Sequence, residues 1–180
     1  MGTAEVTERR LAELEARVAM LEDERQLRDL LAAYSFTADL YRGPDWVELW
    51  TDDGVYDLGD QNRPDAYTGR FTGPDELLAL ITGDGMPPPG RSQHHVHGPV
   101  TFRIDGDHAT AEGYSVTFVQ GDPAAGDGGA ADAGDQKADV WTIGFSRWTF
   151  HRVDGRWKIG RRDRRELGAA DQADVISRPT

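Results

Sequence analysis

The clearest indication of the fold is VTFRIDGDHATA, residues 100–111. Apolar side chains at Val100, Phe102 and Ile104 alternate with polar ones, which is the period of a strand with one buried face. The aspartate and glycine residues that follow are typical of a tight hairpin turn, and small apolar residues resume after it. These residues therefore predict an antiparallel β-hairpin.

A second hairpin is predicted further along the chain. Residues 140–153 form its first strand, Asp154 and Gly155 form the turn, and Trp157 and Ile159 lie on the returning strand. In the first hairpin, the apolar residues of the returning strand are Ala109, Ala111, Tyr114, Val116 and Phe118.

The chain before the hairpins has a helical pattern. An apolar stripe with spacings of three and four begins at Leu11, shifts phase after Leu21 and continues to Tyr34. We expect a long or kinked helix from about residue 5 to 39. We interpret its first part as an arm that packs against the domain or a partner subunit, with a coiled coil as the alternative. The first part of the stripe consists of Leu11, Leu14, Val18 and Leu21.

Two shorter helices are predicted at Gly43 and Gly73, each followed by proline and aspartate. A short strand is expected at residues 55–58. Helices followed by hairpins indicate an α+β fold, in which a cone-shaped, curved antiparallel sheet wraps around the long N-terminal helix. Such a sheet leaves a cavity at its open end, where small molecules bind.

The 180 residues fit one domain with short extensions. We expect an N-terminal helical arm at 1–20, the domain itself at 21–166 and a polar tail at 167–180. Residues 121–139 are almost entirely glycine, alanine and aspartate, and they bury too little apolar area to offset the entropy of ordering. This segment is predicted to be a mobile loop.

Composition excludes several classes of function. The formal net charge of −12 argues against a nucleic-acid or anionic-membrane partner. The chain has no cysteine, which excludes disulfides, zinc–thiolate sites and thiol catalysis. No apolar run has the length of a membrane span, and the first residues do not resemble a signal peptide, so a cytoplasmic protein is expected. The apolar back face of an open sheet predicts a homodimer or homotrimer.

The candidate chemistry lies where the long helix ends and a strand begins. Tyr34 and Asp39 are five residues apart near the helix end, and His95 precedes the first hairpin. A carboxylate beside an imidazole is a general base with its own orienting group, and a phenol adds a proton donor. These groups move protons on an organic substrate without a metal or a nucleotide, so no cofactor is expected.

A metal site is the alternative for the histidines, since His95 and His97 share one face of a strand. Thr101 and Phe102 stand where a carboxylate ligand would complete a cupin-type site, and no further histidine follows His97 nearby in sequence. We therefore expect no metal.

From about residue 20 to 165 the chain resembles the SnoaL-like group within the nuclear-transport-factor-2-like fold. The resemblance implies an α+β barrel that is open at one end and holds a small molecule. The matching segments are residues 21–31, Tyr34, Asp39, Trp46, residues 50–56, His95, residues 105–111 and residues 152–159.

The resemblance also implies roles for individual residues. Three eliminating enzymes of this fold (scytalone dehydratase, bile-acid 7α-dehydratase and hexachlorocyclohexane dehydrochlorinase) use an aspartate and a histidine, which match Asp39 and His95. A shift of one residue would select His94 instead. Tyr34 matches a catalytic tyrosine of the second enzyme, and Arg162 matches a pocket arginine of the third. Tyr34 would then be the acid and Arg162 the oxyanion partner.

The two dehydratases carry a second ionisable group on the next strand, where this chain has Phe118, with Gln120 close by. This departure favours a one-base elimination, isomerisation or cyclisation over a two-group dehydration. The residues expected to contact substrate are Trp46, Tyr56, His94, His97, Tyr114, Phe118, Gln120 and Trp148.

The sequence thus predicts a cofactor-independent lyase, isomerase or cyclase that acts on a carbonyl-bearing, polyketide-like or polycyclic small molecule. The alternative is a non-catalytic subunit that binds ligands or assembles with a larger one, such as the small subunit of a ring-hydroxylating dioxygenase.

Overall fold

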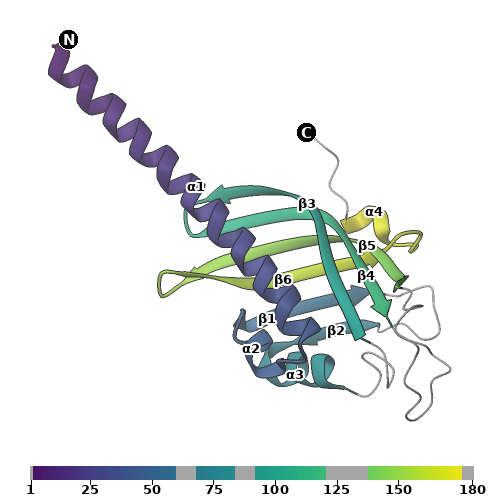
Figure 1. The fold of residues 1–180 in the computed structure, drawn as a ribbon. Coiled ribbons are helices and arrows are strands. Elements are labelled where there is room, and N and C mark those ends of the chain that lie inside the picture. Colours follow the sequence, from purple (N-terminus) through teal and green to yellow (C-terminus); the bar gives the residue numbers. More distant parts are fainter. Residues whose placement is uncertain (1, 60–67, 84–91, 121–137, 176–180) are drawn as a thin grey trace.

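The computed structural model describes residues 2–59, 68–83, 92–120 and 138–175. In this part of the chain, six strands form one curved, open sheet that packs against the second half of a long helix, while the first half of the helix projects beyond it (Figure 1). The predicted α+β fold is confirmed. The elements are α1 (Thr3–Asp39), α2 (Gly43–Val47), β1 (Trp50–Gly59), β2 (Gly69–Thr72), α3 (Gly73–Thr82), β3 (Ser92–Asp105), β4 (His108–Gln120), β5 (Ala138–Val153), β6 (Arg156–Glu166) and α4 (Gln172–Val175).

The strands follow the order β2-β1-β6-β5-β4-β3. Both predicted hairpins, β3–β4 and β5–β6, are present, and Gly106 and Gly155 adopt positive φ in their turns. The sheet is not wholly antiparallel as expected, because β1 pairs with β6 in parallel. The short strand β2 was not predicted, since its four residues show no apolar alternation.

The long helix is continuous, and its two halves differ in burial. Leu27, Leu31, Tyr34 and Ala38 pack on the sheet, whereas every residue from 3 to 22 is exposed. Among the described residues, the arm therefore does not pack against the domain.

A bulge in β6 decides which of its side chains face the helix. Phe150 pairs with Ile159 and Thr149 with Arg161, so Gly160 is an extra residue in the ladder. After it, the alternation changes phase, and Arg162 points into the interior with 1% of its surface exposed.

The segment after β6 is not simply a polar tail up to residue 175. Ala169 and Val175 are buried, and Arg165 donates to the carboxylate of Asp171 at 2.5 Å. Of the predicted loop at 121–139, residues 121–137 lie outside the described residues, and residues 138 and 139 are the first two of β5. Among the described helices, none combines the length and apolarity needed to cross a membrane.

Candidate functional site

Asp39 and His95 are in direct contact. Asp39 is the last residue of α1, and its Oδ1 lies 2.7 Å from Nδ1 of His95 on β3. The same carboxylate accepts the backbone N–H of His95, at 3.0 Å to Oδ1 and 3.1 Å to Oδ2. The side chains are only 16% and 13% exposed. The structure therefore brings together the carboxylate and the imidazole proposed from the sequence.

This contact determines how the His95 ring can react. A carboxylate only accepts hydrogen bonds, so Nδ1 carries the proton and Nε2 keeps its lone pair. Burial lowers the pKa of His95 below its ordinary value; Asp39 raises it in part, and the nearby Arg162 and Arg164 lower it further. His95 is thus a neutral, oriented imidazole at pH 7, as a general base requires.

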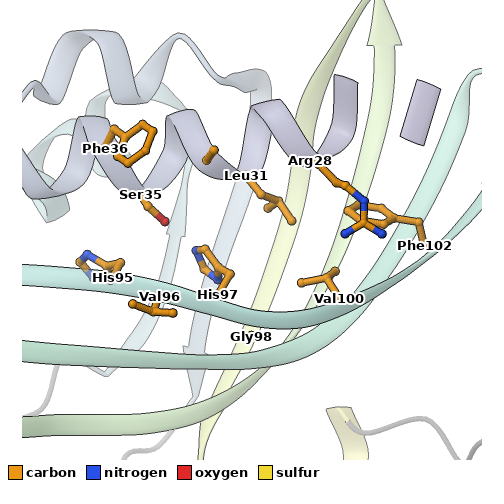
Figure 2. A pocket seen from close by; sticks show the side chains of 11 residues that line it. Arg28, Leu31, Ser35, Phe36, His95, Val96, His97, Gly98, Val100 and Phe102 are labelled. Atoms are coloured by element: carbon orange, nitrogen blue, oxygen red, sulfur yellow. The ribbon is translucent and has the colours of Figure 1, made fainter. Parts of the chain in front are cut away.

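A pocket of about 320 Å³ lies between α1 and β3, and His95 and His97 form part of its wall (Figure 2). Arg28, which lies over the ring of Phe102 at 5.1 Å, is at the far end of the pocket from His95. The walls between these ends are mainly apolar, which suits a hydrophobic ligand. The lining residues are Arg28, Leu31, Ala32, Ser35, Phe36, His95, Val96, His97, Gly98, Val100 and Phe102.

His97 separates this pocket from the protein core. Its ring packs edge-on against Tyr34 and Trp148, with centroids 5.6 and 5.4 Å away. Its Nε2 is buried and has no hydrogen-bond partner in the described residues. Burial, followed by the charge of Arg162, lowers the pKa of His97 well below its ordinary value. A buried ring nitrogen beside a pocket is suited to bind a polar atom of a ligand.

Tyr34 and Arg162 form a second pair, behind His97. Arg162 donates to the hydroxyl oxygen of Tyr34 at 2.5 Å and to that of Ser146 at 3.1 Å. The guanidinium lies 4.3 Å from the ring centroid of Trp148 and 4.9 Å from that of Tyr56. Burial raises the pKa of Tyr34, against the opposing effect of Arg162, so the phenol remains protonated.

The four predicted catalytic residues are therefore placed as two pairs. Asp39 and His95 adjoin the pocket, whereas Tyr34 and Arg162 are buried among aromatic rings and are not part of its wall. Arg162 is buried although it lies in a run of charged residues on β6. Its influence on the pocket is electrostatic, since it lowers the pKa of both His95 and His97.

Sequence reasoning missed Arg164 and the hydroxyls that hold the two buried arginines. Arg164 is 6% exposed and donates to Thr142 at 2.9 Å. Ser115 lies 3.4 Å from both Arg162 and Arg164. Burial lowers the pKa of Arg164. The sequence signal that could have found them is the recurrence of Ser and Thr at alternate positions of β4 and β5, between mostly apolar residues.

The expected substrate contacts are only partly brought to the site. Trp46, Tyr56 and Trp148 are in the core, and His94 is exposed on the side of β3 opposite His95. This placement favours His95 over His94 as the base. In the described part of the chain, no three His, Asp or Glu side chains are grouped so that they could hold a metal ion.

The inward face of strand β4 is not the one that was expected to contact substrate. Ser115, Thr117 and Val119 are buried, so Tyr114, Phe118 and Gln120 share the opposite face, where Tyr114 is 51% exposed and packs on Phe145. These three residues therefore do not line the pocket. The partner of His95 across the ladder is Thr117, whereas Phe118 pairs with His94.

Comparison with protein families finds a SnoaL-like domain over residues 19–163. The chain belongs to the SnoaL-like family. A search of curated proteins finds no significant match.

Solved structures of this family's fold are similar over most of the chain. An NTF2-like protein with a cystatin-like fold from Novosphingobium aromaticivorans is 28% identical, covers 93% of this chain and 97% of its own, and has a TM-score of 0.72. A candidate aromatic ring hydroxylase from the same organism is 19% identical over 82% of this chain and 90% of its own, with a TM-score of 0.61.

A candidate scytalone dehydratase, also from Novosphingobium aromaticivorans, is 18% identical over 81% of this chain and 85% of its own, with a TM-score of 0.58. At these identities the last two likenesses show the fold alone.

Proposed function

We propose that this SnoaL-like chain is a cofactor-independent lyase, isomerase or cyclase, in which Asp39 and His95 form a general base for a carbonyl-bearing, apolar small molecule. The observation that supports the proposal most directly is the 2.7 Å contact between Asp39 Oδ1 and His95 Nδ1 at the wall of a pocket. It leaves Nε2 of a neutral ring as the proton acceptor.

The proposed step is the removal of a proton from the carbon next to a carbonyl. The C–H proton passes to His95 Nε2, the C–H electron pair forms a carbon–carbon double bond, and the π pair of the carbonyl moves to its oxygen, which gives an enolate. The imidazolium is stabilised by Asp39. The enolate then expels a β-substituent, takes a proton at another carbon, or attacks a second carbonyl, which gives a lyase, an isomerase or a cyclase respectively.

The charge around the pocket supports an enolate. Arg162 and Arg164 are buried within electrostatic reach of His95, and their described hydrogen bonds go to the hydroxyls of Tyr34, Ser115, Ser146 and Thr142. A fixed positive charge in a region shielded from water stabilises negative charge that develops in a transition state. His97 forms part of the same wall, and its Nε2, which has no hydrogen-bond partner in the described residues, would donate to the carbonyl oxygen.

The size and lining of the pocket support an apolar substrate. About 320 Å³ bounded by side chains such as Leu31, Phe36 and Val100 accommodates an aromatic or small polycyclic ketone. This shape, together with the family, supports a polyketide-like substrate class.

The test is deuterium exchange at carbon. A panel of aromatic and polycyclic ketones is first screened for binding by ligand-observed NMR. Each ligand that binds is then incubated with the protein in D₂O, and the incorporation of deuterium at the carbon next to the carbonyl is followed. His95→Ala should slow incorporation at least about tenfold, because a positioned general base contributes roughly 10²- to 10⁴-fold.

The matched control is His94→Ala, which removes the exposed neighbouring histidine on the opposite face of the same strand. It should leave exchange unchanged. Equal exchange in the wild type and in His95→Ala would overturn the proposed base, and loss of exchange in His94→Ala alone would move the base to His94.

A non-catalytic binding or assembly subunit is the second candidate. It is favoured by the burial of Tyr34, which leaves the predicted acid outside the pocket wall, and by Thr117, which is the uncharged neighbour of His95 on β4. Ketones that bind but exchange no deuterium, together with recovery of a larger subunit in a pulldown, would support it. Recovery of this chain alone would count against an assembly role.

A further inference from the structure

The first half of α1 carries an apolar stripe that nothing in the described part of the chain covers. In the arm, which we define as residues 3–22, every residue is exposed. The side chains that form this stripe are large and apolar, yet they are between 49% and 60% exposed: Leu11, Leu14, Val18 and Leu21. Four large apolar side chains in one row on a projecting helix (Figure 1) indicate a surface that is buried in an assembly.

The stripe and the packed face of the helix are on opposite sides. At about 100° per residue, Leu11 and Val18 lie roughly half a turn from Leu27 and Leu31, which contact the sheet. The arm therefore cannot bury its stripe on its own domain. A partner that covers the stripe would meet the helix from the side away from the sheet.

We propose that the arm pairs with the arm of a second copy of this chain as a parallel, in-register, two-stranded coiled coil. Leu11 and Val18 occupy heptad positions a, and Leu14 and Leu21 occupy positions d. A β-branched residue at a with leucine at d favours two strands. The sheet of each copy lies on the far side of its helix, so two domains fit without meeting at the axis.

The charges beside the stripe select the second copy and its direction. Position e holds Glu15 and Glu22, and position g holds Arg10 and Arg17. In a parallel pair, g of one helix faces the following e of the other, which places Arg10 opposite Glu15 and Arg17 opposite Glu22. An antiparallel pair would place e against e and g against g, so that like charges would meet.

These flanking charges are also free to pair between chains. In the described residues, the ion pair within the arm joins Arg9 and Glu13 on the other side of the helix, and no ion pair involves the residues at e and g named above. The next heptad ends the seam, because Arg25 and Arg28 replace the apolar residues and pair with Asp29 and Glu24 of their own helix. The coiled coil is thus limited to about 30 Å of helix.

The first experiment measures the dimer dissociation constant of the full chain by sedimentation equilibrium. The wild type should be a dimer at micromolar concentration. Val18→Glu should raise the dissociation constant at least about tenfold, since two carboxylates would face each other across the seam. Met20→Glu is the control, because Met20 is also 53% exposed but lies on the opposite side of the helix. It should leave the constant within about twofold.

The second experiment tests the direction. The chain has no cysteine, so a single introduced thiol reports one contact. Thr7 is at position d, and two Thr7→Cys chains in a parallel pair would bring their Cα atoms within disulfide range, about 4.4–6.8 Å. In an antiparallel pair centred on the stripe, the same atoms would be about 27 Å apart along the axis.

Mild oxidation of Thr7→Cys should give a covalent dimer in high yield, and Arg9→Cys, on the other side of the helix, should not. A monomeric wild type, or a Val18→Glu variant that dimerises as tightly as the wild type, would overturn the pairing of arms. The latter result would place self-association on the sheet. Absence of a Thr7→Cys cross-link in a dimer that Val18→Glu disrupts would overturn the parallel direction.

Discussion

Replacing Asp39 by Asn tests the proposed base at its orienting group. Asp39 accepts the His95 ring proton at 2.7 Å and the His95 backbone N–H at 3.0 and 3.1 Å. The amide oxygen of Asn can still accept the backbone N–H, so β3 keeps its contact with the end of α1. What is lost is the negative charge that stabilises the imidazolium formed when His95 takes a proton.

The size of the effect follows from that single contact. A hydrogen bond to a charged group contributes about 1.5–3 kcal/mol, which corresponds to a rate loss of roughly 10- to 100-fold. The contact is mostly shielded from water, with side chains 13% and 16% exposed, so the upper part of this range is expected. Exchange should be measured at pH 7.5, where His95 is neutral in both proteins.

The pH profile provides a second readout. In the wild type, activity should fall with acid only below about pH 6.5, because the pKa of His95 is lowered from its ordinary value. Asp39 raises this pKa, so Asp39→Asn should move the acid limb of kcat/KM to still lower pH. The control is Asp29→Asn, an exposed carboxylate on the same helix that should change neither rate nor profile. An unchanged rate, or an acid limb displaced upwards, would refute the role of Asp39.

Two further predictions concern stability. Burial lowers the pKa of His95 and of His97, so below about pH 6.5 the unfolded chain binds protons that the folded chain does not. The free energy of unfolding should therefore decrease as pH falls, by up to about 1.4 kcal/mol per pH unit for each group. Urea titrations at pH 7.5 and 5.5 measure this change in stability, and its dependence on pH should be shallower in His97→Gln. Greater stability at pH 5.5 than at pH 7.5 would be inconsistent with two buried neutral imidazoles. Leu27→Ala should lower the free energy of unfolding by about 2–5 kcal/mol, since Leu27 is 0% exposed. Leu21→Ala on the exposed arm should change the stability of the monomer by less than about 0.5 kcal/mol, and equal losses in the two variants would mean that the arm packs on the domain.

The sequence was sufficient where one periodicity dominated. The spacing of apolar residues predicted α1, and alternation with Asp-Gly turns predicted both hairpins. Asp39 and His95 were found because one ends the helix and the other lies on the strand packed against it, and the family resemblance aligned them. Local patterns and that alignment pointed to the same pair, and the structure brings the two side chains into contact.

The sequence was insufficient where the polar interior inverts the usual pattern. On β4, Ser115 and Thr117 face inward, where Ser115 accepts from the two buried arginines, whereas the large Tyr114 and Phe118 face outward. Hydrophobicity alone therefore favoured the wrong face. Arg162 faces inward because Gly160 adds a bulge to β6, and the alternation of apolar and polar residues does not predict where a bulge occurs.

Local sequence patterns also could not predict which apolar stripe of α1 contacts the sheet. The stripe at Leu11 and the stripe at Leu27 have the same spacing, and only the structure shows which one contacts the sheet. An apolar stripe specifies that something is buried against it, but not whether the same chain provides it.

The most direct measurement is ¹⁵N NMR of the His95 ring in the free protein at pH 7, assigned with His95→Gln. Proton abstraction by Nε2 requires a neutral ring with its proton on Nδ1, held by Asp39. Chemical shifts showing that form are the expected result. A ring that is cationic at pH 7, or that carries its single proton on Nε2, would contradict the proposed general base.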